Sequence, residues 1–375
     1  NNTLIGHVAG ANLTLGNSNT ILGHSSGIFI TTGSNNILIG DNVGNSIEIG
    51  SANVFIGNSA GSNYTESNSV FIGNRAGTNS IRSGNTLVGS LAGTELTIGQ
   101  NNVAFGNSAG RRIENGSANT LIGALAGDNT AIDASDNIFI GAFAGRNVTA
   151  NETIAIGSSA GQNITGIRNI VIGHETGSAI TTGAYNTFLG YQSGLNLTSG
   201  SFNTFIGRET GHTSNTGSFN TFIGNQAGFN FTGDETVIIG ASAGVSLTTG
   251  LENTIIGFQS GFLLTSGSFN TFLGIRSGSI ATTGSNNTFI GRNAGRSMTT
   301  NGSSTLIGND AGRSLTAGNT VIIGAFAGDL ITTGAQNTIV GYSAATNLIT
   351  GSNNTIFGHR AGANLTGSDN VIIGN

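Results

Sequence analysis

The residues of this sequence that could carry chemistry are few, and they are scattered along the chain. A metal site needs several ligands that converge on one point. Four of the five histidines instead stand directly after a glycine that closes an apolar triplet, where a turn is expected. We therefore interpret them as turn residues and expect no metal or cofactor site; the five are His7, His24, His174, His212 and His359.

Paired carboxylates are the other candidate for catalysis. Asp133 with Asp136 and Asp234 with Glu235 could in principle serve as an acid and base pair. A glycosidase needs two such groups facing each other across a cleft of roughly 5–9 Å. A flat, thin β-roll, the fold that the repeats predict, offers no evident cleft of this kind, so we interpret them as solvated turn charges. The chain has no Cys and no Lys, which removes thiol chemistry and the phosphate-binding P-loop, and we expect no enzymatic activity.

The composition is far from that of an ordinary globular protein. The chain of 375 residues contains 63 Gly and no Pro, Cys or Trp, and only 8% of its residues are charged, against roughly 25% in an average soluble protein. The net charge is −5, and Arg111–Arg112 is the only basic pair, which argues against a nucleic-acid partner. The apolar runs are far shorter than the ~20 residues of a membrane helix, so we expect no membrane insertion in this segment.

A single repeat accounts for the whole sequence. The glycine that closes the phrase "NTxIG" recurs at spacings of 16–18 residues in 23 copies, from Gly6 to Gly374. We number this glycine as position 0 of its repeat. Position −4 is mostly Asn, −3 is always β-branched, −2 and −1 are apolar, +4 is Gly in all copies but one, and a further apolar residue stands near +7. We therefore expect one continuous repeat domain over 1–375, and a segment of a longer chain because the pattern is cut at both ends.

Each repeat is predicted to form a strand, a turn, a shorter second strand and another turn. Stacked repeats give an all-β fold, a parallel β-solenoid or two-sided β-roll of about 23 rungs of 16–18 residues each. Stacked Asn side chains at position −4 can form an amide ladder. Glycines at positions 0 and +4 are expected to make the turns; examples are Gly6, Gly10, Gly207, Gly211, Gly224, Gly228, Gly274 and Gly278.

The strand is apolar on both faces, which predicts a partner. Alternation sends positions −1 and −3 to one face and −2 to the other. We expect −1 and −3 to line the interior of the coil and −2 to form a seam between copies of the same chain, most simply a homotrimer; the reverse assignment stays open. The predicted seam carries Phe55, Phe71, Phe139, Phe188, Phe205, Phe222, Phe272 and Phe289.

The phrases N-T-[FLI]-[IL]-G-x-x-[AS]-G and [LI]-T-[TS]-G-[SA] resemble two groups of repeat proteins. One is the head repeat of trimeric autotransporter adhesins, and the nearer one is the repeat of tail-fibre-like proteins of bacteria and phages. The resemblance covers the entire chain. It implies a trimeric parallel β-roll fibre that is extracellular, on a cell surface or a virion tail, and that binds a host-surface glycan or protein receptor.

Two functional hypotheses follow. The first is a structural and adhesive fibre, in which an exposed aromatic cluster at position −5 either packs on a neighbouring chain or contacts a receptor; its residues are Tyr185, Phe202, Phe219 and Phe269. The alternative is an ice-binding solenoid, in which flat ranks of threonine order water. Those ranks are Thr31–Thr32, Thr181–Thr182, Thr248–Thr249, Thr282–Thr283 and Thr332–Thr333.

Overall fold

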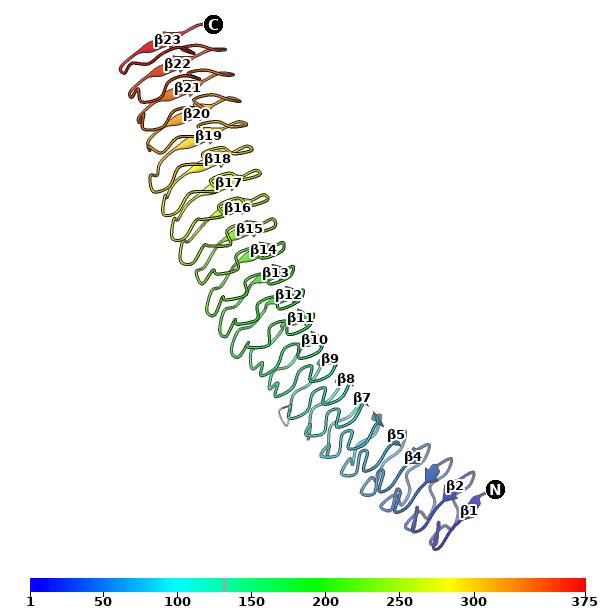
Figure 1. Cartoon of the computed structure of the whole chain (residues 1–375). Coiled ribbons are helices and arrows are strands. Elements are labelled where there is room, and N and C mark those ends of the chain that lie inside the picture. Colours follow the sequence, from blue (N-terminus) through cyan, green and yellow to red (C-terminus); the bar gives the residue numbers. More distant parts are fainter. Residues whose placement is uncertain (131–132) are drawn as a thin grey trace. The chain divides into compact units, whose positions relative to one another are not determined.

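The computed structural model describes residues 1–130 and 133–375. They form two compact units, residues 1–186 and 187–375, and both are built from the same rung (Figure 1). All regular secondary structure in the described residues is β, with 23 strands of three residues each. The prediction of an all-β parallel solenoid is thus confirmed, whereas a single continuous domain over 1–375 stays a prediction.

The first unit contains eleven strands, and each pairs with the next in parallel. They are β1 (Thr3–Ile5), β2 (Thr20–Leu22), β3 (Ile37–Ile39), β4 (Val54–Ile56), β5 (Val70–Ile72), β6 (Thr86–Val88), β7 (Val103–Phe105), β8 (Thr120–Ile122), β9 (Ile138–Ile140), β10 (Ile154–Ile156) and β11 (Ile170–Ile172).

The second unit contains twelve strands with the same parallel pairing. They are β12 (Thr187–Leu189), β13 (Thr204–Ile206), β14 (Thr221–Ile223), β15 (Val237–Ile239), β16 (Thr254–Ile256), β17 (Thr271–Leu273), β18 (Thr288–Ile290), β19 (Thr305–Ile307), β20 (Val321–Ile323), β21 (Thr338–Val340), β22 (Thr355–Phe357) and β23 (Val371–Ile373).

Every strand occupies positions −3, −2 and −1 of its repeat, and the pairing is in register. Phe205 of β13, for example, stands opposite Phe222 of β14. The strand stops after three residues because position 0 takes a conformation that ends it. Gly224 has φ +137°, and a Cβ at this site would lie 2.6 Å from the carbonyl oxygen of Gly240. Only glycine fits this close approach between rungs.

The second half of each rung differs from the prediction of a two-sided roll. In the described residues it contains turns and no strand. The backbone N–H groups of Thr14, Leu15 and Gly16 all point at one acceptor, the carbonyl oxygen of Thr31, at 2.9, 3.1 and 3.3 Å. Three donors can converge on one oxygen only where the backbone is bent, so this segment, which holds the place of the Thr-Thr-Gly phrase in its repeat, forms a corner instead of an extended strand.

The predicted seam is wrong, because position −2 lines the interior of the coil. The eight phenylalanines are fully buried within the single chain. Seven of the rings stack on a phenylalanine of a neighbouring rung, with centroids 4.7 Å apart for Phe188 and Phe205 and 4.8 Å apart for Phe205 and Phe222. The reverse assignment therefore holds. The residues concerned are Phe55, Phe71, Phe139, Phe188, Phe205, Phe222, Phe272 and Phe289.

The glycines at position +4 make room for this interior column. Gly228 has φ +57°, and a Cβ there would come within 2.8 Å of the ring of Phe222. The eight glycines predicted for turns all have positive φ and lie in the turn that follows a strand. They are Gly6, Gly10, Gly207, Gly211, Gly224, Gly228, Gly274 and Gly278.

Candidate functional site: outer faces and corners of the coil

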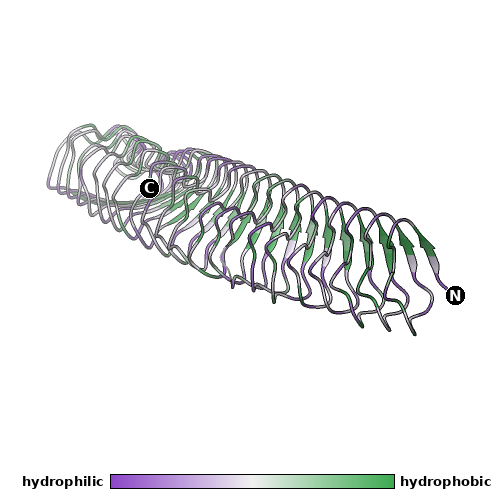
Figure 2. Ribbon diagram, turned by 90° about the horizontal axis from the view of Figure 1, so that it is seen from below, coloured by the Kyte–Doolittle hydropathy of each residue, from purple (hydrophilic) through white to green (hydrophobic). Residues whose placement is uncertain are grey.

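With position −2 inside, the strands turn positions −3 and −1 outward. Figure 2 shows these strands in green, side by side. Position −1 leaves large apolar side chains in solvent: 58% of Phe105, 45% of Leu189 and 42% of Leu273 is exposed. Position −3 adds a β-branched residue to the same face in every strand. This outer strand face, positions −3 and −1, is an apolar surface that the single chain leaves partly uncovered. Other exposed apolar side chains, such as Leu15 and Ile49, lie at the corners.

The four aromatic residues predicted for a receptor are exposed, but they do not form one cluster. The rings of Phe202 and Phe219 stack with centroids 5.1 Å apart. Phe269 is separated from Phe219 by Glu235 and Glu252, which hold position −5 in the two rungs between them. The three phenylalanines and the two glutamates all have a positive backbone φ of 54° to 60°, which directs the side chain at position −5 away from the corner.

Tyr185 lies in the first unit, next to an exposed ion pair. Arg168 donates a hydrogen bond of 3.0 Å to its hydroxyl, and the guanidinium carbon lies 5.6 Å from the ring centroid. The same guanidinium donates to Glu152 at 2.6 and 3.3 Å. These bonds lower the pKa of the Glu152 carboxyl and explain why the three side chains hold one another in place.

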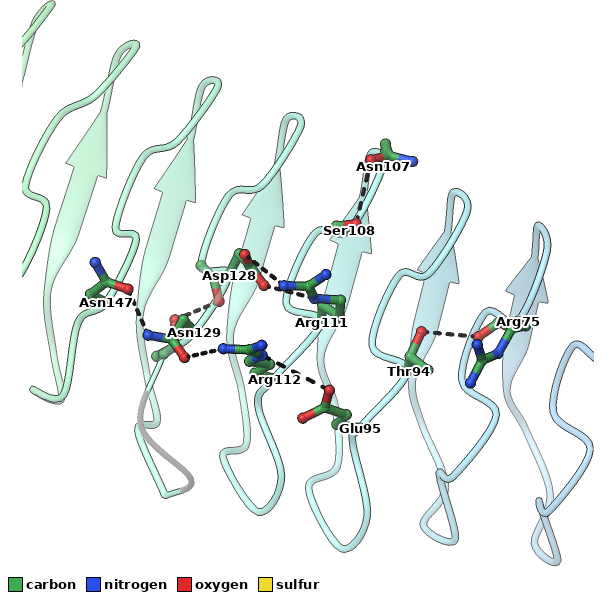
Figure 3. Close-up of polar contacts among 12 residues, drawn as sticks. Arg75, Thr94, Glu95, Asn107, Ser108, Arg111, Arg112, Asp128, Asn129 and Asn147 are labelled. Atoms are coloured by element: carbon green, nitrogen blue, oxygen red, sulfur yellow. Dashed lines mark hydrogen bonds and ion pairs between the residues drawn. The ribbon is translucent and has the colours of Figure 1, made fainter.

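A charged corner joins successive rungs of the first unit (Figure 3). Arg111 donates two hydrogen bonds to Asp128, at 3.1 and 3.3 Å, and the Asp128 side chain is only 3% exposed. The neighbouring Arg112 donates to Asn129 at 2.9 Å and lies 4.0 Å from Glu95. Every charge in this group already has a partner on an adjacent rung, so the corner is a structural clamp between rungs.

The histidines and acidic pairs also lie at corners. The rings of His7 and His24 stack at 5.3 Å, and His24 Nδ1 lies 2.9 Å from Asp41. The ring of His212 stacks on Phe229 at 4.7 Å. Throughout residues 1–130 and 133–375, no three His, Cys, Asp or Glu side chains come together in a way that could hold a metal ion.

Both acidic pairs serve bonds between rungs. Asp133 accepts a hydrogen bond of 2.8 Å from the Asn115 side chain, and Asp234 accepts one of 2.7 Å from the backbone N–H of Ser218. Their neighbours Asp136 and Glu235 have positive φ in the adjoining turn. The geometry thus places both pairs at exposed corners rather than across a cleft.

The hydrogen bonds of the threonine ranks differ from what the ice-binding hypothesis predicts. The hydroxyl of Thr31 donates to the carbonyl oxygen of Glu48 at 3.1 Å, that of Thr248 to Thr265 at 2.9 Å and that of Thr332 to Ile349 at 3.0 Å. Each of these hydroxyls donates its only hydrogen bond to a carbonyl oxygen of the next rung. The first threonine of such a pair is therefore part of the corner and has no donor left for ordered water.

A serine ladder was missed by sequence reasoning. Position −6 holds Ser in many repeats, and its hydroxyl oxygen accepts the backbone N–H of position −6 in the preceding rung. The distances are 3.0 Å from Ser34 to Ser51 and 2.9 Å from Ser51 to Ser67. The recurring "GS" before the Asn is the sequence signal that could have revealed it.

The described residues contain no helix with the length and hydrophobicity that a membrane span requires. In comparisons with known proteins, the chain matches no protein-family model, no curated protein and no solved structure.

Proposed function

We propose that this chain is a repeat segment of an extracellular structural and adhesive fibre, on a cell surface or a virion tail. Three copies would pack against one another along the outer strand face, and the corners would remain in solvent. The proposal keeps the predicted homotrimer and moves its seam from position −2 to positions −3 and −1.

The observation that supports it most strongly is the composition of the outer strand face. Position −1 carries Ile in most strands, and the exposed members include Leu22, Phe105, Leu189, Leu273 and Phe357. Monomeric proteins rarely leave a contiguous apolar surface of more than a few hundred Å² in water. Charged side chains avoid this face and lie at the corners, which is the division expected between an interface and a solvated rim.

The first test is the native mass in solution, measured by light scattering on a size-exclusion column. The proposal predicts about three times the 37.6 kDa of the single chain. A triple variant with Ile206→Asp, Ile223→Asp and Ile256→Asp places charges on the outer strand face and should shift the mass to that of one chain. The circular dichroism spectrum should stay β-like, because these side chains lie outside the coil.

The matched control puts the same three charges on a corner. Asn74, Asn107 and Asn225 are exposed residues at position +1, and their replacement by Asp should leave the trimer intact. A wild-type chain of single mass, or a trimer that survives the three isoleucine substitutions, would contradict the proposed assembly.

Ice binding remains a second candidate on one specific observation. Four consecutive rungs carry Thr at position −3: Thr254, Thr271, Thr288 and Thr305. Their hydroxyls lie on the outer strand face and donate no hydrogen bond within the described parts of the chain. This rank is open to water only if the chain is a monomer. A single-chain mass together with thermal hysteresis of the solution would favour ice binding over the fibre.

A further inference from the structure

A polar hollow of about 570 Å³ lies in the second unit, on the corner that leads into strands β18 to β21. Positions −6 and −5 of successive rungs line most of it, and no charged side chain takes part. The residues that matter are Ser285, Asn286, Gly302, Ser303, Gly318 and Asn319. The hollow therefore offers only neutral hydrogen-bonding groups.

The serine ladder is interrupted at the hollow. Just before it, the N–H of Ser268 donates to the hydroxyl of Ser285 at 3.0 Å. Just after it, the N–H of Ala335 donates to the hydroxyl of Ser352 at 3.1 Å. Between these two bonds, position −6 is Gly302, Gly318 and Ala335 in turn. None of these three residues has a hydroxyl to offer the rung before it.

Three backbone N–H donors therefore lack a hydroxyl acceptor. The N–H groups of Ser285, Gly302 and Gly318 have no acceptor among the residues that the structure describes. They follow one another at the spacing of the rungs, ~4.8 Å. A row of donors of this kind binds a ligand whose oxygen atoms stand where the serine oxygens would have been.

The side chains around this row suit hydroxyl groups. Asn286, Ser303 and Asn319 are exposed members of position −5, and they make no side-chain hydrogen bond within the described residues. Amides and hydroxyls can both donate and accept, as each hydroxyl of a sugar does. No charged side chain lines the hollow, so an anion would gain no ion pair there.

An aromatic ring completes the arrangement. Phe269 holds position −5 in the rung directly before Asn286, and 53% of its surface is exposed. A flat apolar ring beside a row of polar groups matches a pyranose, which has an apolar C–H face and a polar rim of hydroxyls.

We propose that this hollow, with Phe269 at its edge, binds a neutral oligosaccharide. The inference rests on the adhesive role proposed above and specifies it, because it assigns the ligand class and the rungs that hold it. The site lies on a corner and away from the outer strand face, so it can be tested whatever the native mass proves to be.

The test is binding of the full chain to a printed array of neutral and anionic oligosaccharides, followed by calorimetric titration with the best soluble binder. Asn286→Gly and Asn319→Gly remove the amides and keep the positive φ, and each should weaken binding about 3- to 10-fold for one lost hydrogen bond. Ala335→Ser supplies the missing hydroxyl for the N–H of Gly318. It should weaken binding while leaving the melting temperature unchanged or higher.

Phe269→Asn should weaken binding to a similar degree, and Asn353→Gly, at the same repeat position outside the hollow, should have no effect. Binding of neutral oligosaccharides with this pattern of losses supports the proposal. No binding of any neutral oligosaccharide, binding of anionic ones only, or binding that survives all four variants of the hollow would overturn it. None of these results depends on the trimer, which the native mass tests separately.

Discussion

The side-chain oxygen of Asn19 accepts two hydrogen bonds from Asn36, one from its backbone N–H at 3.0 Å and one from Nδ2 at 3.1 Å. The same Nδ2 also donates to the carbonyl oxygen of Gly50 in the next rung at 2.9 Å. In turn, Asn36 Oδ1 accepts the N–H of Asn53 at 3.0 Å. Asn36 therefore ties three rungs together while fully buried.

Asn36→Ala should cost about 2–4 kcal/mol of local stability, because it strands the N–H of Asn53 and the carbonyl of Gly50 inside the coil. Hydrogen exchange of the Asn53 amide should accelerate accordingly. Asn58→Ala is the control, since the side chain of this exposed asparagine makes only surface bonds, donating to Asp41 at 3.2 Å and accepting from the Ser59 hydroxyl at 3.1 Å. Equal protection of Asn53 in both variants would show that the amide ladder contributes little.

Phe205→Ala should destabilise the second unit by about 3–5 kcal/mol, as expected when a buried phenylalanine leaves a cavity. Phe205→Asp should unfold the rungs around β13 and should not yield folded single chains. The exposed Phe219→Asn should change stability by less than about 0.5 kcal/mol. Chemical denaturation followed by circular dichroism measures all three. If Phe205→Asp gave folded single chains, position −2 would be the seam between chains after all.

The one natural exception at position +4 sets up a reciprocal pair of substitutions. Ala345 occupies this position with φ 54°, and the buried position −2 residue of its own repeat is Ile339. Ala345→Gly removes the strain of a left-handed alanine and should stabilise the chain by roughly 1 kcal/mol. Gly228→Ala adds both that strain and a contact with the ring of Phe222, so it should destabilise by more. Melting temperatures that move in the same direction for both would refute this explanation.

Tyr64 makes stability depend on alkaline pH. Its hydroxyl bonds to the carbonyl oxygen of Ser67 at 2.7 Å and to the hydroxyl of Ser69 at 2.8 Å, and burial raises its pKa from 10.0 to about 12. Because the folded state holds this proton more tightly than the unfolded state, the stabilisation is complete below pH 10. It is lost as pH rises toward 12, on the order of 2 kcal/mol.

Chemical denaturation at pH 9 and at pH 11.5 measures this loss. Tyr64→Phe has no proton to lose and should show a smaller decrease between the two pH values than the wild type. The exposed Tyr342→Phe is the control and should behave as the wild type does. Identical decreases in all three proteins would mean that Tyr64 ionises as freely in the folded state as in the unfolded one.

The period of the repeat was enough to predict the strand at positions −3 to −1, the turns after it and the Asn ladder, because each depends on residues close together in one repeat or stacked at the same position. The shorter second strand was wrong, because that half of the rung bends into corners. The inward face was not predicted, since positions −3, −2 and −1 are all apolar. The missing clue lies at position +4: a Cβ on Gly211 would come within 2.6 Å of the Phe205 ring. An almost constant glycine opposite a large side chain indicates the crowded side of the coil.

The candidate sites were predicted less well. The aromatic residues at position −5 were recognised, but their neighbours on other rungs decide what they can bind, and only stacking shows those neighbours. Thr31 was assigned to a water-ordering rank, although its hydroxyl closes a corner. The backbone N–H groups of Ser285, Gly302 and Gly318 lack an acceptor because the next rung offers no side-chain oxygen at position −6. A missing oxygen of this kind can be recognised only after the serine ladder is known.

The registry of the strands also has a mechanical consequence. Hydrogen bonds between neighbouring strands run along the stacking direction, so tension applied between the ends of a unit would load one rung-to-rung contact after another. Each rung that peels away releases 16–18 residues, on the order of 50 Å of extended chain. A chain built this way lengthens in even steps under a pulling force, as a tether that dissipates load before its attachment breaks.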